Sequence, residues 1–494
     1  MSYLENYFQP FREGIVGIDK KIETPFGKFP IIYADWTASG RFYKPIEDFL
    51  VDEVGPYIAN THTETNTTGS TMTHAYKMAR KIIKKHVHAS DNDVLISTGS
   101  GMTGVINKFQ RLLGLKIHEK HYQKLTFDKF ERPIIFVSHM EHHSNQTSWL
   151  ETIGEVVIIP ADENGLFSLS NFEEILKEHE SHPFKITAVT SCSNVTGIKT
   201  PYHKIAKLTH KYGGKCFVDF ACSAPYIDIN MHPNDPEEKL DAIYFSPHKF
   251  LGGPGSSGIL IFCNSLYNNR IPDCPGGGTV DWTNPWGQHK YIDQIEERED
   301  GGTPAFLQTI KVAQSILLKE KMGVDNITNR EKELNDIMWP GLTSIPGLHM
   351  LANNHRERLC IYSFFIEDLH YNLAVKMLND RFGIQVRGGC SCAGTYGHYL
   401  LEVSYELSQT VTNEINMGIL NNKPGWIRMS VHPTTTDEEA KYLVNAVREI
   451  AENHVEWAKD YEYDMKHNQF ILSNQPNMEL ELVKTWFTNE VESV

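Results

Sequence analysis

The sequence contains no long apolar run and no surplus of positive charge. No stretch approaches the roughly 20 consecutive apolar residues that a membrane-spanning helix requires. Acidic residues outnumber basic ones by 62 to 47, which gives a formal net charge of −15, and no basic stripe appears. Since nucleic acids bind basic surfaces, we expect neither a membrane-spanning segment nor a nucleic-acid partner.

Signals of secretion are also missing. The first 14 residues have neither a basic segment nor an apolar core, so we do not expect a secretory signal there. Eight cysteines are too few for a disulfide framework in a chain of 494 residues. These features favour the cytoplasm. Two cysteines, Cys390 and Cys392, lie in a glycine-rich loop beside Arg387, where we expect an exposed thiolate.

Short apolar runs alternate with helical patterns from about residue 31 to 300. This alternation is typical of a mostly parallel sheet with helices on both faces, where ligands gather beyond the carboxyl ends of the strands. The predicted strands are residues 94–97, 134–138, 156–159, 186–190, 215–219, 242–246 and 258–262. The predicted helices lie near residues 71–88, 102–114, 170–179 and 201–212.

The pattern changes after residue 304 and predicts a second domain. Its expected elements are a long helix over 305–322, strands near 359–366 and 427–431, and a charged helix over 437–459. We therefore expect an α/β protein with a large, mostly parallel-sheet domain and a smaller α+β domain. The expected division is 31–304 for the large domain, 1–30 with 305–463 for the small one, and 464–494 for a tail.

The most informative segment is Ser246-Pro247-His248-Lys249, at the end of the predicted strand 242–246. A lysine at a strand end can form a Schiff base with a carbonyl cofactor, and Asp219 ends the preceding strand. An amine for the aldehyde and an acid for the pyridinium nitrogen are what pyridoxal phosphate requires. The alternative, an ordinary solvated lysine, leaves the neighbouring serine, histidine and aspartate unexplained.

Further polar residues follow other strands. Ser100-Gly101-Met102 opens a helix and, with Ser246 and His248, can hold a phosphate, although an ordinary strand-to-helix turn has the same pattern. The His142 imidazole can stack on a cofactor ring and move protons. The amide of Asn194 can bond the phenolic oxygen of the cofactor or form a turn.

Two further interpretations concern metal and substrate. His139, His142 and His143 cluster, but no other zinc-type spacing accompanies them, so we expect no metal. Arg428 lies inside an apolar, strand-like run, where a charged group needs a partner. It can bind a substrate carboxylate through both guanidinium nitrogens, or it can form a structural salt bridge.

These residues together resemble a known family. From Tyr33 to about residue 452, the chain is similar to class V, fold-type I pyridoxal phosphate enzymes, and most of all to the group II cysteine desulfurases and selenocysteine lyases. The matching motifs are Tyr33-Ala34-Asp35-Trp36-Thr37-Ala38, Glu141-His142-His143-Ser144-Asn145, Ser193-Asn194-Val195-Thr196-Gly197, Val218-Asp219, Ser246-Pro247-His248-Lys249, Gly301-Gly302-Thr303-Pro304, Arg387-Gly388-Gly389-Cys390-Ser391-Cys392-Ala393 and Arg428-Met429-Ser430.

The resemblance implies a role for each position. Lys249 would carry the cofactor as a Schiff base, with Asp219 at its ring nitrogen. The other cofactor contacts would be His142 and Asn194 at the ring, and Ser100, Gly101, Met102, Ser246, His248 and, from the other subunit of a homodimer, Thr303 at the phosphate. Arg428 and Asn60 would bind an amino acid substrate.

In the resembled enzymes a cysteine at the position of Cys392 attacks the substrate's sulfur, which leaves a persulfide and releases alanine. A protein that accepts this sulfur is an expected partner. Alternatives that keep the cofactor but need no cysteine nucleophile are a class V aminotransferase, a kynureninase-like hydrolase or another β-lyase. A non-enzymatic sulfur carrier on the same fold is a further alternative, although Lys249, Asp219 and His142 argue against it.

The sequence also departs from the resembled family. Cys222 stands where a glutamine is usual, Thr63 stands where an arginine is common, and Cys390 adds a second thiol. Cys392 and Arg428 are separated by 35 residues, more than in the resembled enzymes. The extra segment, residues 396–422, is predicted to contain an amphipathic helix that would form a lid. These differences bear on the substrate more than on the cofactor.

Overall fold

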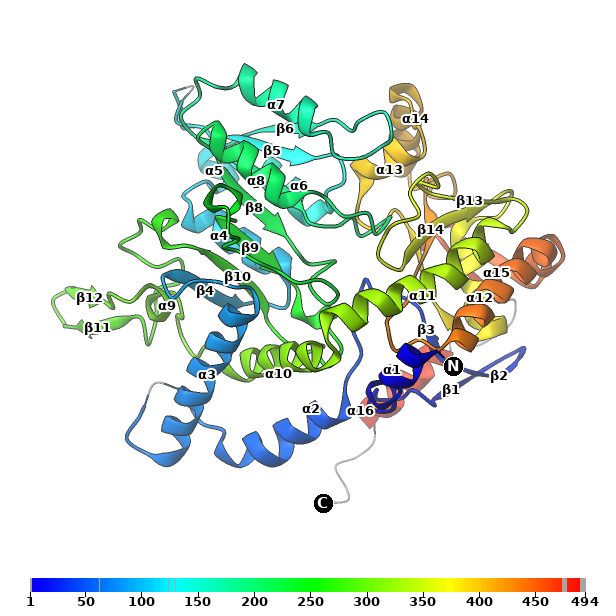
Figure 1. Cartoon of the computed structure of the whole chain (residues 1–494), viewed down its shortest axis with the longest axis horizontal. Coiled ribbons are helices and arrows are strands. Elements are labelled where there is room, and N and C mark those ends of the chain that lie inside the picture. The colour runs from blue at the N-terminus through cyan, green and yellow to red at the C-terminus, as the bar shows by residue number, and fades with distance from the viewer. Residues whose placement is uncertain (1, 62, 123, 129, 473–477, 489–494) are drawn as a thin grey trace.

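The structure is a computed structural model that describes residues 2–61, 63–122, 124–128, 130–472 and 478–488 (Figure 1). Its larger unit is built on a seven-stranded sheet in the order β4-β10-β9-β8-β7-β5-β6. The strands are β4 (Asp93–Thr98), β5 (Ile134–Ser138), β6 (Glu155–Ile159), β7 (Lys185–Thr190), β8 (Lys215–Asp219), β9 (Ala242–Phe245) and β10 (Gly258–Cys263). Only β10 runs antiparallel to its neighbours, so the predicted mostly parallel sheet is confirmed.

Helices cover both faces of this sheet because its strands are apolar on both sides. Val218 and Ile243 lie in one core, and the adjacent residues Phe217 and Tyr244 lie in the other. One core includes residues of α3 (Thr67–His86), α7 (Leu169–Glu178), α8 (Tyr202–Lys211) and α10 (Phe306–Met322). The other includes residues of α4 (Met102–Leu112) and α6 (His143–Leu150). The four helices predicted between the strands are confirmed, whereas α6 was not predicted.

A smaller antiparallel sheet forms a second unit. Its strands are β13 (Leu348–Met350), β14 (Ile361–Ile366), β17 (Trp426–Ser430) and β16 (Arg387–Gly389), in that order. Its helices are α11 (Val324–Thr343), α12 (Tyr371–Phe382) and α15 (Asp437–Trp457), which share one apolar core with the sheet. Nearby lie α1 (Tyr3–Glu13) and the parallel pair of β3 (Ile32–Tyr33) and β15 (Ile384–Gln385). The predicted strands near 359–366 and 427–431 and the predicted helix over 437–459 correspond to β14, β17 and α15.

Helix α10 bears on where the two units divide. Its residues Phe306, Ile310 and Ala313 pack with Met72 and Tyr76 of α3, and further residues enter the core beneath the large sheet. The sequence division placed this helix in the small domain, after residue 304. Because its packing lies with the large sheet, we propose a boundary near Gly323, with residues 1–30 in the smaller unit.

The remaining elements are short or peripheral. The hairpin of β11 (Val280–Thr283) and β12 (His289–Tyr291) projects from the edge of the larger unit (Figure 1). The extra segment forms α13 (Gly394–Leu400) and α14 (Tyr405–Asn416), and so contains the predicted helix. The others are β1 (Lys21–Thr24), β2 (Gly27–Pro30), α2 (Lys44–Phe49), α5 (Glu119–Tyr122), α9 (Ile295–Arg298), β18 (Tyr461–Asp464), β19 (Gln469–Leu472) and α16 (Met478–Thr488).

Two parts of the predicted tail, residues 473–477 and 489–494, lie outside the described residues. Strand β19 pairs with β18 and packs against α12, so this part of the tail lies on the smaller unit. Among the described residues, no helix combines the length and the apolar character that crossing a membrane requires.

A glycine at the junction of the two units gives a test of the packing. Gly197 has φ +73°, and a Cβ there would lie 2.6 Å from the carbonyl oxygen of Leu359. We expect Gly197→Ala to lower the thermal unfolding temperature more than Gly213→Ala. Gly213 also has a positive φ, +74°, but a Cβ there would meet nothing within 4 Å. The control therefore measures only the left-handed strain, about 1–2 kcal/mol. Equal shifts in scanning calorimetry would contradict the close junction.

Candidate active site

A cavity of about 200 Å³ opens where strands of the large sheet end and the smaller unit begins. Its lining combines the ends of β7, β8 and β9 with residues from β16, β17 and the loop after β16. The lining residues are Thr37, Ala38, Met102, Thr103, His142, Ser144, Thr190, Cys192, Asn194, Asp219, Ala221, Cys222, Ser246, His248, Lys249, Arg387, Ser391, Cys392 and Arg428. The structure thus brings together predicted residues from positions 102 to 428.

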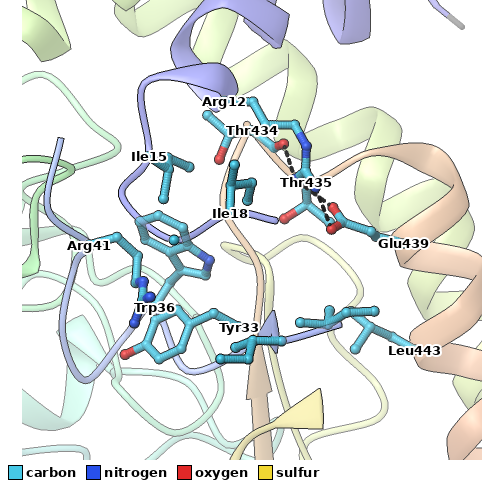
Figure 2. Close-up of a pocket in the computed structure, with 13 residues that line it drawn as sticks. Arg12, Ile15, Ile18, Tyr33, Trp36, Arg41, Thr434, Thr435, Glu439 and Leu443 are labelled. Carbon is cyan, nitrogen blue, oxygen red and sulfur yellow. Dashed lines mark hydrogen bonds and ion pairs between the residues drawn. The ribbon is translucent and has the colours of Figure 1, made fainter. Parts of the chain in front are cut away.

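A second pocket lies nearby but is much smaller (Figure 2). Arg12 closes one side through paired bonds of 2.8 and 2.7 Å to the Glu439 carboxylate, and Trp36 and Tyr33 form part of the wall. Its volume of about 30 Å³ has room for a water or two and not for an amino acid. None of the predicted site residues lines it, so the chemistry belongs to the larger cavity.

Asp219 and Lys249 supply the charge pair of the cavity. Asp219 ends β8 and is buried, and its Oδ1 accepts the Ala221 N–H at 2.8 Å. Burial raises the pKa of Asp219 to about 6, although the nearby Lys249 ammonium acts in the opposite direction. Burial likewise lowers the pKa of Lys249, opposed by Cys222 and Asp219. A lysine with a lowered pKa is more often an uncharged amine, which is the form that reacts with a carbonyl.

Met102, Ser246 and His248 form a small polar cradle beside this pair. The Ser246 hydroxyl accepts the Met102 N–H at 2.8 Å, at the first residue of α4. A Cβ at Gly101 would lie 3.2 Å from Ser246 Oγ and 3.4 Å from His248 Nε2. Glycine therefore keeps this space open at a helix N-terminus, where an anion is stabilised. Burial lowers the pKa of His248 to about 4.

His142 lies on the cavity wall just before α6. Its Nδ1 accepts the Ser144 N–H at 3.1 Å, which makes it the N-cap of this helix. Burial, together with the Lys249 charge, lowers the pKa of His142 to about 3, so the ring is neutral at pH 7. The neighbouring His139 bonds to the Gly165 carbonyl oxygen, and His143 bonds to the Gly394 N–H. The three rings thus have separate partners, and the described residues contain no group of three or more side chains suited to a metal.

Arg428 both lines the cavity and forms an ion pair. Its Nη2 lies 2.7 Å from Asp35 Oδ1, and its Nη1 donates to the Asn194 carbonyl at 3.2 Å. Arg387 pairs with the same aspartate, with Nε 3.2 Å from Oδ2. The two arginines face each other in the register of β16 and β17. Sequence reasoning missed Arg387 as a site residue, although it stood at the head of a matched motif, because strand register is not visible in one sequence.

Cys392 is exposed and lies on the cavity wall in an unusual backbone conformation. Ser391 and Cys392 have φ values of +51° and +56°, in the left-handed region that costs a non-glycine residue about 1–2 kcal/mol. Hydrogen bonds hold the loop in place. The Asn194 amide donates to the Ser391 carbonyl at 2.7 Å, and the Trp426 indole donates to Ser391 Oγ at 3.1 Å. Asn194 Oδ1 is buried and has no hydrogen-bond partner in the part of the chain that the structure describes.

Three other cysteines lie close to this loop or to the cavity. Cys390 is half-buried against the core of the larger unit. Cys192 and Cys222 line the cavity and donate to the Ser193 carbonyl at 3.7 and 3.8 Å. A hydrogen bond with Cys192 and the Lys249 charge hold the pKa of Cys222 below its usual value. In the sequence, Cys222 stood out only as a departure from a family pattern, because no motif around it indicates a role in the site.

Four predicted residues do not line the cavity, and one of them, Gly101, directly precedes Met102 of the polar cradle. Ser100 is exposed at the turn before α4. Asn60 and Thr303 are exposed and hydrogen-bonded to each other, with Asn60 Nδ2 3.4 Å from Thr303 Oγ1. Their predicted contacts with substrate and phosphate therefore do not arise within this single chain. The role of Thr303 in a second subunit stays a prediction.

The class V aminotransferase family matches residues 32–443, so the chain belongs to this family of pyridoxal phosphate-dependent enzymes. It is 28% identical over 368 residues to a probable cysteine desulfurase from Halalkalibacterium halodurans. This match covers 74% of this chain and 84% of that relative. A solved cysteine desulfurase from Thermococcus onnurineus matches with a TM-score of 0.69 and 22% identity, over 86% of this chain and 95% of that one. A solved cysteine desulfurase from Escherichia coli matches with a TM-score of 0.68 and 20% identity, and the match covers 90% of this chain and 98% of that one. These likenesses confirm the predicted fold-type I architecture.

Removal of the Asp219 charge should separate stability from cofactor binding. The folded-state pKa of about 6 lies above the ordinary 3.8, so the carboxylate form destabilises the cofactor-free protein once the pH exceeds both values. We expect cofactor-free Asp219→Asn to be more stable than the cofactor-free parent at pH 7.5, by about 1–3 kcal/mol. Adding pyridoxal phosphate should raise the thermal unfolding temperature of the parent more than that of the variant. A variant less stable without the cofactor would contradict this account of Asp219.

Proposed function

We propose that this protein is a pyridoxal phosphate-dependent cysteine desulfurase that takes sulfur from an amino acid and releases alanine. The observation that carries the proposal is the position of Cys392 on the wall of the cavity that contains Lys249 and Asp219. An exposed thiol beside a half-buried amine and a buried carboxylate provides both a sulfur acceptor and a cofactor site. The names of the similar proteins support the same reaction.

The residues of the cavity fit pyridoxal phosphate. Lys249 would bind the aldehyde carbon, and the Asp219 carboxylate would keep the ring nitrogen protonated. His142 would pack on the ring, while the cradle of Ser246, His248 and the turn at Met102 would hold the phosphate. The space kept open by Gly101 and the unpartnered Asn194 Oδ1 support this placement. When bound, the cofactor supplies an electron sink for bonds at the substrate's α- and β-carbons.

The substrate's carboxylate would bind the two arginines. Asp35 holds Arg428 and Arg387 from one side, so their guanidinium groups are oriented before a substrate arrives. Arg428 Nε is buried and has no hydrogen-bond partner among the described residues. A substrate carboxylate would accept further hydrogen bonds from the two guanidinium groups, which Asp35 occupies only in part. Asn60 would contribute from a neighbouring subunit in a homodimer.

Sulfur transfer would need a thiolate at Cys392. The thiolate attacks the substrate's Sγ, so an S–S bond forms and the Cβ–Sγ bond breaks. The electron pair of the broken bond stays with the carbon fragment, which takes up a proton and leaves as alanine. His142 would move protons here because it lines the same cavity and its neutral ring has a nitrogen that can accept one. The product on the enzyme is a Cys392 persulfide.

The exposure of Cys392 has a further consequence for the reaction cycle. A persulfide at an exposed position can be attacked by an external thiol, which would regenerate Cys392. We therefore propose a cytoplasmic enzyme that delivers its sulfur to an acceptor protein. Helices α13 and α14 follow the loop directly and would border the entrance as a lid.

The test compares two thiols in one loop. We expect Cys392→Ala to lose more than about 100-fold of its alanine and sulfide formation from cysteine, because the thiolate that receives sulfur is gone. Cys390→Ala should keep most of the activity, since this thiol packs against the core. Both variants should keep the cofactor absorbance at about 420 nm, whereas Lys249→Ala should lose it.

Full turnover in Cys392→Ala would rule out the persulfide route. Turnover of another amino acid without sulfide release would instead favour one of the alternatives that need no nucleophilic cysteine, such as an aminotransferase or another β-lyase. Absence of the absorbance band in the parent protein would leave only the non-enzymatic carrier on the same fold.

A further inference from the structure

We propose that His143 is a positioning residue that holds Cys392 at the cavity, a role that rests on the proposed function of this cysteine. His143 is the first residue of α6, next to His142. Its backbone N–H donates to the Cys392 carbonyl at 2.7 Å, and its ring Nε2 accepts the Gly394 N–H at 2.9 Å. One residue therefore holds the loop at two points, at the thiol-bearing Cys392 and two positions after it.

The loop needs these hydrogen bonds because its backbone conformation is unfavourable by itself. Ser391 and Cys392 are consecutive non-glycine residues with left-handed φ values, which persist only where the surroundings over-determine them. Asn194 and Trp426 hold Ser391 from the larger and smaller units. His143 provides the corresponding bonds for the stretch from Cys392 onward.

A second contact between α6 and the loop lies one turn further along. Thr395 Oγ1 donates to Gln146 Oε1 at 2.8 Å, and Gln146 is buried. The helix therefore meets the loop at three points, of which two belong to His143. Because His142 caps the same helix and lines the cavity, the first turn of α6 fixes the cavity-facing imidazole and the thiol together.

The ring of His143 is suited to accepting a hydrogen bond. Burial, with the charge of Lys423, lowers the pKa of His143, so the ring is neutral and one nitrogen keeps a lone pair. A Cβ at position 394 would lie 3.1 Å from Nε2, so glycine lets the backbone approach the ring this closely. An apolar side chain of similar size at position 143 would keep the backbone bond to Cys392 but would leave the Gly394 N–H without its acceptor.

The experiment uses the holoenzyme and three variants at one position. His143→Leu removes the acceptor and keeps bulk, and His143→Gln restores an acceptor oxygen near the place of Nε2. His143→Asn is a second acceptor-free variant, because its amide is too short to reach Gly394. His179→Leu is the matched control, since His179 is a half-buried histidine at the end of α7, on a different helix. Three quantities are measured: hydrogen exchange at the Gly394 amide, the cofactor absorbance change on adding cysteine, and the single-turnover rate of persulfide formation.

In His143→Leu and His143→Asn we expect faster exchange at Gly394 and persulfide formation slowed about 10- to 100-fold, as for a misplaced nucleophile. The absorbance change on adding cysteine should stay that of the parent, because substrate binding does not use this loop contact. His143→Gln should recover both exchange protection and rate, and His179→Leu should match the parent in all three measurements.

A parent-like persulfide rate in His143→Leu and His143→Asn would overturn the proposal, as would an equal loss in His143→Gln. A parallel loss of the absorbance change would also overturn it, since that result indicates a general defect of the site. Failure of the proposed function gives a different result. Cys392→Ala would then turn over like the parent, while exchange at Gly394 still reports whether His143 holds the loop.

Discussion

The site depends on two opposite charges that share the end of a buried parallel sheet. Because β8 and β9 run side by side in the same direction, Asp219 and the segment that carries Lys249 emerge at one edge. Both groups are desolvated there, so the pKa of the acid is raised to about 6 and that of the amine is lowered. These shifted pKa values lower the stability of the cofactor-free protein. They favour binding of a cofactor that brings a ring nitrogen to the acid and an aldehyde to the amine. The rest of the cavity is arranged around that pair.

The smaller unit completes the cavity from the opposite side. Its sheet contributes Arg387 and Arg428 in register, and Asp35, from the segment that follows β3, neutralises part of their charge. The loop after β16 then turns through a left-handed backbone that presents Cys392. The arginine–aspartate ion pairs and the strained loop have a chemical use only because they line the same cavity. Hydrogen bonds from α6 and from Asn194 connect the loop to the larger unit.

The sequence predicted what local patterns determine. Apolar runs that end in polar residues predicted all seven strands of the large sheet and placed Asp219 and Lys249 at one edge of it, whereas the family resemblance added Arg428 to this site. The sequence could not predict the antiparallel direction of β10, because a strand buried on both faces has the same pattern in either direction. It also missed Arg387 as a site residue, because the register between two strands is not visible in one sequence. It missed His143 as a loop contact, because one sequence does not show which residues 251 positions apart touch each other.

The central claim is that Cys392 receives sulfur from the substrate in the cavity that contains Lys249. The most direct test is mass spectrometry of the alkylated, cofactor-loaded protein after a single turnover with cysteine. The account predicts one additional sulfur atom, in equal amount to the alanine formed, which peptide fragmentation assigns to Cys392 and not to Cys390, and none on the peptides of Cys192 or Cys222. Alanine formation without sulfur on Cys392 would contradict it.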